Sequence, residues 1–325
     1  MTTARAELVK QSSATTTATS RRGKARRASG KDILWAYVLI APLFIGLFIF
    51  YIWPAFQTLY FSFTKWGAFG KYHWDGLTNY QQMLHDTELG QSLINTLIFT
   101  VISVPGSIAI SILIAALLNT KIRGVGIYRT LYFLPAVTMP AAIAVVWKWL
   151  YNGDYGLINN ALSLFHIRGP YWAADPKIAL YSLIVVAVWS SIGNNMILFL
   201  AGLQSIPSTY QEAAAIDGAG PIYRFFRITL PLLSPTVFFA TVISLINAFQ
   251  VFDLIYLMFG GSSANGSSAN SAIDSTQTIV YLFFKSAFLI NNKGYAAAIA
   301  MLLFVIILIV TIIQLQLQKR WVHYS

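Results

Sequence analysis

The stretch YQEAAAIDGAGPIYRFFRITLP, residues Tyr210–Pro231, decides the fold, because it is a polar interruption between two long apolar runs. Its local signals predict two short helices. Ser208 and Gln211 have the S-x-x-Q spacing of a capping box, which places the start of the first helix near Thr209. Gly218 predicts the end of that helix, since glycine tolerates the left-handed backbone of a helix C-terminus.

The same stretch contains signals for the second helix and for a partner. Pro221 predicts the start of this helix, because proline is favoured at a first helical position, and Leu230-Pro231 predicts its end. The first helix carries three successive alanines, Ala213–Ala215, so its surface is nearly bare. Small side chains let a helix approach closely, which fits docking into a groove of another protein.

Residue by residue, this stretch resembles the EAA loop of ABC importer permeases, the membrane subunits of binding-protein-dependent uptake systems. The matching positions are Glu212, Ala213, Ala214, Gly218, Ile228, Leu230 and Pro231. The resemblance implies a cytoplasmic loop that docks into a cleft of a separate ATP-binding subunit. It also implies that coupling to that subunit runs through Glu212, Ala213, Ala214, Asp217 and Gly218. The alternative is a helical hairpin that merely connects two membrane spans.

The composition is that of a polytopic membrane protein. The chain is 57% hydrophobic and 10% charged, whereas soluble proteins average about 45–50% apolar and about 25% charged residues. It has no cysteine, which excludes disulfides, thiolate metal sites and thiol nucleophiles. The net charge is +11, but eight of the 22 Lys and Arg residues lie in the first 31 positions, so the charge belongs to a tail and not to a nucleic-acid-binding face.

Residues 1–30 are rich in Ser, Thr, Ala and Arg and lack a periodic apolar pattern, so we expect a disordered basic cytoplasmic tail. Such a segment is attracted to the anionic cytoplasmic surface; the alternative is a solvated tail that only sets orientation. The permease domain is expected over residues 31–325, with the EAA loop at about 204–233. The first apolar run is longer than the apolar region of a cleavable signal peptide, which has roughly 7–15 residues, so we do not expect it to be one.

Six apolar runs are long enough to span a membrane, since about 20 residues cross a hydrocarbon core of about 30 Å. They are Ile33–Trp53, Ser92–Leu118, Ile127–Tyr151, Ile178–Leu203, Thr236–Phe259 and Tyr295–Leu317. The predicted fold class is therefore an all-α membrane protein, a bundle of six transmembrane helices with a cytoplasmic coupling-helix loop. The basic tail places both termini in the cytoplasm of a cell-membrane protein.

Interior prolines predict bends in the second and third spans, at Pro105, Pro135 and Pro140. These bends would make room for a central path or reflect irregular packing without function. The low-complexity run from Gly260 to Ser271 predicts a flexible loop.

The resemblance widens to nearly the whole chain after the tail. The stretches Leu39–Trp66, Gly76–Tyr80, Arg129–Tyr151 and Phe249–Gly261 are similar to the carbohydrate-uptake branch of ABC importer permeases, the maltose and glycerol-phosphate type. This similarity implies a sugar as the cargo, rather than an amino acid, peptide or metal.

Several kinds of chemistry have no motif in the sequence. There is no G-x-x-x-x-G-K-[ST] phosphate loop, so ATP must be bound by a partner subunit and no cofactor is expected in this chain. The histidines show no metal-binding spacing, and no G-x-S-x-G nucleophile motif occurs. We therefore expect no catalytic residue, no metal site and no enzymatic activity.

Polar residues inside the spans are the candidates for a substrate path: Asn194, Asn247, Gln250 and Trp189. The amides of Asn247 and Gln250, three residues apart, are expected on one helix face near mid-membrane. Uncharged amides beside aromatic rings suit sugar hydroxyls and ring faces. The alternative is interhelical hydrogen bonding. Asp253, nearly two turns beyond Asn247, is expected at the outer mouth or at the membrane interface.

The sequence thus predicts the permease subunit of an ABC importer that translocates a sugar or oligosaccharide. The expected partners are a second homologous permease, a dimer of ATP-binding subunits, an extracellular solute-binding protein or lipoprotein, and membrane lipid, but no nucleic acid. The alternatives are a permease for another polar solute, such as a glycerol-phosphate compound, and a secondary transporter. A secondary transporter predicts intramembrane acids and an inverted repeat, neither of which is found.

Overall fold

The computed structural model describes residues 30–66, 70–120, 123–260 and 271–321. The chain divides into two compact units, Met1–Phe56 and Gln57–Ser325. Nearly all of the expected tail, residues 1–29, and most of the expected loop, residues 261–270, lie outside the described residues.

The described residues of the first unit form one long helical segment. Helix α2, Gly30–Leu47, continues through the π-helical turn η1, Phe48–Ile52, into α3, Trp53–Phe61, whose last residues belong to the second unit. The wide turn comes just before Pro54, which has no N–H group for a regular helical hydrogen bond. From Leu34 to Phe61 the segment is long and apolar enough to cross a membrane.

After the end of α3, the second unit continues with a short antiparallel strand pair of β1, Thr64–Trp66, and β2, Tyr72–Trp74. Helix α4, Thr78–His85, follows, and α5, Thr87–Leu118, starts at a side-chain cap. Asp86 Oδ1 accepts hydrogen bonds from the backbone N–H groups of Glu88 and Leu89, at 2.8 and 3.2 Å. An aspartate at this position satisfies donors that have no partner within the helix.

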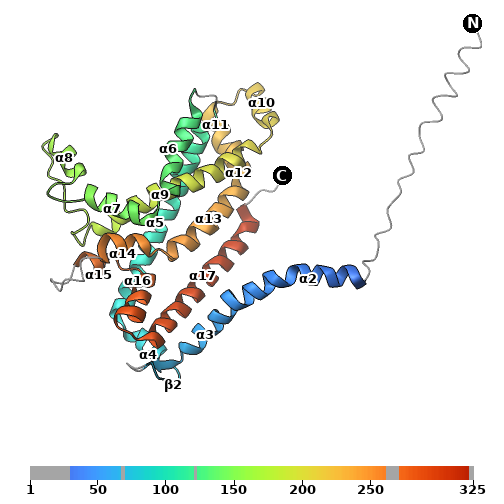
Figure 1. The fold of residues 1–325 in the computed structure, drawn as a ribbon. Coiled ribbons are helices and arrows are strands. Elements are labelled where there is room, and N and C mark those ends of the chain that lie inside the picture. Colours follow the sequence, from blue (N-terminus) through green and yellow to red (C-terminus); the bar gives the residue numbers. More distant parts are fainter. Residues whose placement is uncertain (1–29, 67–69, 121–122, 261–270, 322–325) are drawn as a thin grey trace, which may run out of the picture. The chain divides into compact units, whose positions relative to one another are not determined.

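The other elements are helical. They are α6 Val125–Val137, α7 Pro140–Leu150, α8 Leu157–Ser163, α9 Ala179–Gln204, α10 Ser208–Ile216, α11 Pro221–Arg224, η2 Phe225–Thr229, α12 Leu230–Leu232, α13 Ser234–Phe249, α14 Asp253–Phe259, α15 Ser271–Thr276, α16 Ile279–Phe284, η4 Lys285–Leu289 and α17 Lys293–Trp321. Helix α5 packs against α9 and α13, α6 packs on α9, and α7 packs on α14 (Figure 1).

In the part of the chain that the structure describes, four helices are long and apolar enough to cross a membrane: Leu34–Phe61, Thr87–Leu118, Ala179–Gln204 and Lys293–Lys319. The number rises to six if each of two bent helix pairs is one span. These pairs are Val125–Val137 with Pro140–Leu150 and Pro221–Leu232 with Ser234–Phe249. The predicted all-α membrane fold is therefore confirmed, with one short strand pair among the described residues.

The third predicted span, Ile127–Tyr151, is wrong as a single helix. Helix α6 ends at Val137, and α7 begins at Pro140 with its axis turned by 99°. Proline pushes the residue before it out of the helical region, and Met139 accordingly has a ψ of 133°. Pro140 thus breaks the helix as well as bending it, whereas Pro105 lies within α5, which remains one helix.

The fifth predicted span, Thr236–Phe259, is also wrong at its C-terminal end. Helix α13 stops at Phe249, and three non-helical residues, 250–252, separate it from α14. At its other end α13 meets α12 at a bend of 66°. The helix predicted to end at Leu230-Pro231 ends at Leu232, one residue beyond Pro231.

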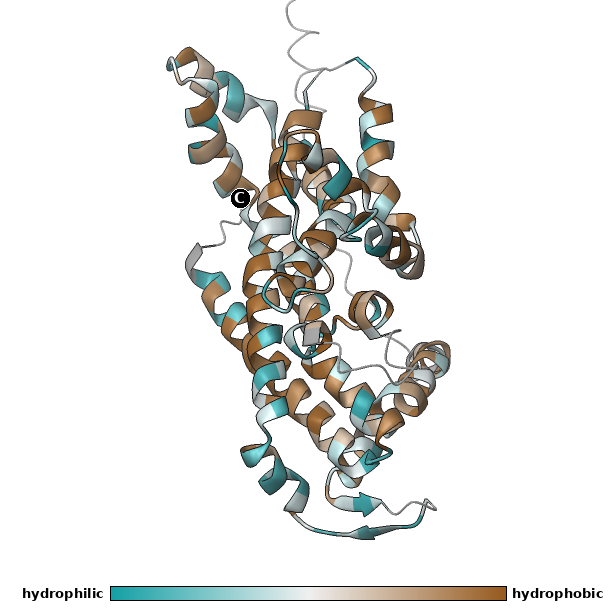
Figure 2. Ribbon diagram, turned by 90° about the vertical axis from the view of Figure 1, so that its left-hand side faces the viewer, coloured by the Kyte–Doolittle hydropathy of each residue, from teal (hydrophilic) through white to brown (hydrophobic). Residues whose placement is uncertain are grey.

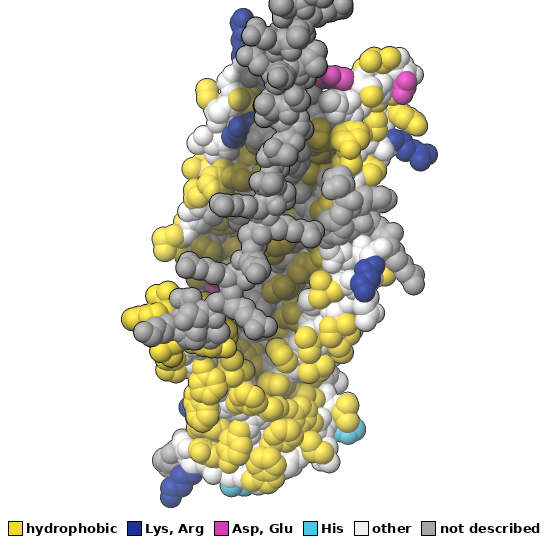
Figure 3. All heavy atoms as spheres, turned by 90° about the vertical axis from the view of Figure 1, so that its right-hand side faces the viewer, with side chains coloured by type: hydrophobic (Ala, Val, Ile, Leu, Met, Phe, Trp, Pro, Cys, Tyr) yellow, Lys and Arg dark blue, Asp and Glu magenta, His cyan; other side chains and the backbone are white. Residues whose placement is uncertain are grey.

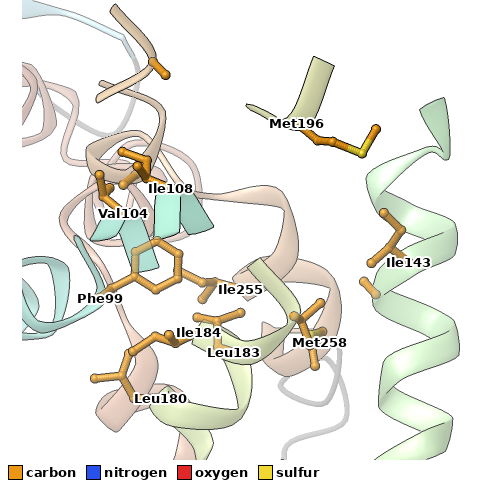
Figure 4. Packing of buried hydrophobic residues seen from close by; sticks show 14 of the residues in the cluster. Phe99, Val104, Ile108, Ile143, Leu180, Leu183, Ile184, Met196, Ile255 and Met258 are labelled. Atoms are coloured by element: carbon orange, nitrogen blue, oxygen red, sulfur yellow. The ribbon is translucent and has the colours of Figure 1, made fainter. Parts of the chain in front are cut away.

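The core of the second unit joins α5, α9 and α14. The side chains of Phe99, Leu183 and Ile255 point toward one another and are at most 2% exposed (Figure 4). Helices α6 and α9 approach closely, since a Cβ atom at Gly193 would lie 2.7 Å from the Tyr132 carbonyl oxygen. The helices are mainly hydrophobic in Figure 2, and many hydrophobic side chains lie on the face shown in Figure 3, as expected for contact with lipid.

Candidate functional site

The two helix breaks meet at one cavity. Because α7 packs on α14, the break between α6 and α7 and the break between α13 and α14 line a common space of about 320 Å³. The lining residues are Pro135, Ala136, Thr138, Pro140, Ile143, Ser190, Asn247, Gln250, Val251, Phe252, Asp253 and Leu254. In membrane proteins, non-helical backbone is tolerated where it is buried in protein or lines a cavity.

A second cavity, of about 200 Å³, lies between α5, α9 and α13 and shares Ser190 and Asn247 with the first. Its polar lining consists of Ser103, Ser107, Ser190, Ser191, Ser244 and Asn247. Among the described lining residues of both cavities, the only charged side chain is Asp253. The two spaces therefore offer hydroxyl and amide groups, which can both donate and accept hydrogen bonds.

The structure brings two of the predicted substrate-path residues together. Asn247 and Gln250 line the same cavity and are both exposed in the single chain. Gln250, however, is the C-cap of α13, and its N–H group lies 3.2 Å from the Asn247 carbonyl oxygen. The two side chains therefore line the cavity from the end of α13 and not from one continuous helix face.

The other two predicted residues, Trp189 and Asn194, line neither cavity. The Trp189 ring packs edge-on against Trp147 with centroids 5.4 Å apart, and Asn194 is exposed on α9. The neighbouring Asn195 is buried and donates a hydrogen bond to Ser244 Oγ at 3.4 Å. Asn195 thus forms an interhelical hydrogen bond, which is the alternative to a substrate-path role for polar residues in the spans.

Asp253 and Thr138 are lining residues that the sequence did not place in the cavity. The helix break brings Asp253 to the space that Asn247 lines, instead of leaving it two helical turns away. No Gly or Pro marks this break in the sequence. Thr138, in contrast, lies between Pro135 and Pro140, a proline spacing that indicates an interrupted helix.

The EAA loop folds around α10, which starts at Ser208, close to the predicted Thr209. The predicted capping box is wrong, because Ser208 already lies in the helix and no side chain caps it. Gln211 instead reaches across the loop, and its Nε2 donates a hydrogen bond to Thr229 Oγ1 at 2.8 Å. This bond fastens α10 to the π-helical turn η2.

Gly218 ends α10 as predicted. Its φ is +78°, a value that side-chain-bearing residues rarely adopt. The Ala219 N–H group donates to the Ala214 carbonyl at 2.9 Å, and the Gly218 N–H group to the Ala215 carbonyl at 3.1 Å. This pair of hydrogen bonds is a Schellman motif, which satisfies the last carbonyl groups of the helix.

Of the residues implied in coupling, Glu212, Ala213, Asp217 and Gly218 are exposed, whereas Ala214 is buried. Apolar side chains beside them are more exposed than is usual: Ile216 by 87% and Ile222 by 77%. Large exposed apolar side chains are typical of surfaces that contact another protein or lipid. The sequence reasoning concentrated on the alanines and missed these two isoleucines.

Residues 85–323 match the family of binding-protein-dependent transport system inner membrane components. The chain belongs to this family. The matched range contains the cavity and the EAA loop, and it gives the chain the role of a transport permease component in a membrane. Among the described residues, no group of His, Asp or Glu side chains is placed to hold a metal ion.

Relatives of this inner membrane component share most of its length. It is 36% identical over 305 residues to the "Probable ABC transporter permease protein YesP" of Bacillus subtilis, covering 93% of this chain and 96% of the relative. It is 35% identical over 292 residues to the sn-glycerol-3-phosphate transport system permease protein UgpA of Pectobacterium atrosepticum, covering 89% and 95%.

A solved structure shares the fold of this inner membrane component. It is a chain of a bacterial ABC transporter involved in the import of the acidic polysaccharide alginate, with a TM-score of 0.77 and 22% identity over 89% of this chain and 96% of that chain. The same fold match, with a TM-score of 0.77 and 21% identity, holds for that transporter in complex with an alginate pentasaccharide-bound periplasmic protein.

Proposed function

We propose that this protein is a membrane-spanning subunit of an ATP-driven importer of a neutral sugar or oligosaccharide. The observation that carries the proposal is the cavity at the two helix breaks, whose described polar lining is hydroxyl and amide except for one carboxylate. Amides and hydroxyls match the mixed donors and acceptors of a sugar. Apolar lining residues such as Phe252 and Pro140 suit the weakly apolar faces of sugar rings.

The lining also favours a neutral cargo over an anionic one. A phosphate or carboxylate would have to leave water, and burying a charge without an opposite charge is unfavourable. The described lining contains no Lys or Arg, and Asp253 would repel an anion. A glycerol-phosphate cargo, the substrate in the name of one relative, therefore suits this cavity less well.

The EAA loop is the proposed contact for a separate ATP-binding subunit. Ile216 and Ile222 expose apolar surface beside Glu212 and Asp217, and Gly218 fixes the end of the docking helix. The loop and both termini would lie in the cytoplasm. ATP can shift the membrane helices between two states only if the ATP-binding subunits have different affinities for them.

The remaining proposed partners are a second homologous permease and an extracellular solute-binding protein or lipoprotein. The exposure of Asn247, Gln250 and Asp253 in the single chain supports a second subunit that closes the cavity. The periplasmic protein in the alginate transporter supports delivery by a binding protein in this system as well.

The test is uptake into vesicles that contain this chain, its partner permease and the ATP-binding subunit, with the binding protein added outside. We expect ATP-dependent uptake of a neutral oligosaccharide and little uptake of glycerol 3-phosphate. Uptake without the ATP-binding subunit would support a secondary transporter instead. Uptake of glycerol 3-phosphate alone would overturn the proposed cargo.

A further inference from the structure

A buried connector of two residues, Gln277–Thr278, joins α15 to α16. Gln277 is 2% exposed and Thr278 is fully buried. Thr278 has extended backbone, with φ −95° and ψ 170°. Polar residues at such depth need hydrogen-bond partners from neighbouring elements.

One side of the connector is fastened to the first turns of α5. Gln277 Nε2 donates to Glu88 Oε1 and to Ser92 Oγ, both at 2.9 Å. The Gln277 carbonyl accepts from Asn95 Nδ2 at 3.0 Å. The backbone N–H group of Ile279, just after the connector, donates to Thr96 Oγ1 at 3.0 Å. Glu88 also forms an ion pair with Lys285 of η4. These contacts fix the connector on α5.

The other side of the connector reaches the candidate cargo cavity. Thr278 Oγ1 donates a hydrogen bond to the carbonyl oxygen of Val251 at 3.1 Å. Val251 is the middle residue of the break between α13 and α14, and it lines both cavities between Asn247 and Asp253. A helix break disturbs the regular pairing of backbone carbonyls, and the Thr278 hydroxyl supplies a partner at that point.

We propose that Thr278 is a positioning residue for the cargo cavity. Its hydroxyl holds the Val251 carbonyl and so sets the direction in which the neighbouring Gln250 amide faces the cavity. Since the connector is fastened to α5, the break is held relative to α5 as well as to its own helix. The role of the cavity in transport rests on the proposed function, whereas the control of its geometry by Thr278 does not.

Thr276 offers a matched control. It is fully buried like Thr278 and lies two residues earlier, but its hydroxyl donates to the Ala272 carbonyl of its own helix at 2.8 Å. Thr278→Val and Thr276→Val therefore each replace a fully buried hydroxyl with a methyl group and keep the shape of the side chain similar. Only Thr278→Val removes the bond to the helix break, and Thr278→Ser keeps a hydroxyl there.

The absence of cysteine provides a direct probe of the geometry. Gln250→Cys would introduce a unique thiol at an exposed lining residue of the cavity. In the full chain in membranes, its rate of reaction with a membrane-impermeant maleimide reports how this residue faces the cavity. Loss of one hydrogen bond changes a local equilibrium by about two- to tenfold.

We expect Thr278→Val to change the labelling rate by a factor in this range, and Thr276→Val and Thr278→Ser to leave it unchanged. Equal rates in Thr278→Val and Thr276→Val would overturn the inference. If Thr278→Val does not insert, Thr278→Ala and Thr276→Ala form the same comparison, judged in the same way.

Uptake in the assembled importer is a separate readout. Thr278→Val is expected to lower the cargo imported per ATP hydrolysed, and Thr278→Ser is expected to restore it. A labelling difference without uptake of a neutral sugar by any variant, including the unsubstituted chain, would disprove the proposed function and leave the positioning role intact. Normal uptake with no labelling difference would disprove the positioning role and leave the proposed function intact.

Discussion

At the scale of single residues, Gly218 is a position where the backbone conformation disfavours a side chain. Its φ of +78° costs most residues about 1–2 kcal/mol. No atom lies within 4 Å of an added Cβ, so conformational strain, and not a clash, would oppose a substitution.

We expect Gly218→Leu to leave the membrane helices folded but to misdirect the end of α10, which uncouples ATP hydrolysis from transport. The measurement is cargo-stimulated ATPase activity of the assembled complex. Gly220→Leu is the matched control, because Gly220 has an ordinary φ of −68° and also has open space around it. Normal stimulation in Gly218→Leu would contradict the prediction.

Asn247 lines both cavities, and among the described residues that do so it alone carries a side-chain amide, which is therefore well placed to contact cargo. Asn247→Leu should reduce uptake several-fold while assembly of the complex, followed by co-purification, stays intact. Asn194→Leu makes the same chemical change on α9 outside both cavities, and we expect a smaller loss. Unchanged uptake kinetics in Asn247→Leu would remove this residue from the cargo path.

At the scale of elements, the hydrogen bond between Gln211 and Thr229 links α10 to the helical segment that leads into α13. That segment has a π-helical turn and a bend of 66° before α13, and α13 ends at the cargo cavity. One continuous path of helices therefore joins the docking loop to the break at Gln250.

We expect Thr229→Val to loosen this link and to lower the ratio of cargo imported to ATP hydrolysed, with ATPase activity retained. A half-buried hydrogen bond contributes about 0.5–1.5 kcal/mol, so a partial loss is expected. Thr229→Ser keeps the hydroxyl and should restore the ratio. Equal ratios in the valine and serine variants would show that the bond has no part in coupling.

At the scale of the whole molecule, the described residues combine four long apolar helices with two bent pairs. The break within the first bent pair, before α7, and the break that follows the second bent pair, before α14, line one cavity because α7 packs on α14. Non-helical backbone is compatible with a membrane where it lines a cavity. The cavity can therefore form between interrupted membrane helices without a large hydrophilic domain.

The basic N-terminal residues are predicted to have no role beyond setting orientation. Deleting residues 2–20 keeps Arg21, Arg22, Lys24, Arg26 and Arg27 next to the first apolar helix. These charges are enough to retain the positive side in the cytoplasm. We expect uptake by the correctly inserted truncation to equal that of the full chain. Lost activity, with insertion verified by protease accessibility, would give the tail a further role.

By itself, the sequence determined the membrane class, the approximate helical runs, the start and end of α10 and the family resemblance. These features are local: the length of an apolar run sets a span, and Gly218 and Pro221 act on their own backbone. Only the tertiary structure decided which polar groups meet. In the folded chain, the Gln211 side chain donates a hydrogen bond to Thr229, and Asn194 lies outside both cavities. A helix break that no Gly or Pro marks in the sequence places Asp253 in the cavity that Asn247 lines. The physical reason is that a hydrogen-bond partner or a cavity lining depends on packing between segments far apart in the chain, which local propensity does not specify.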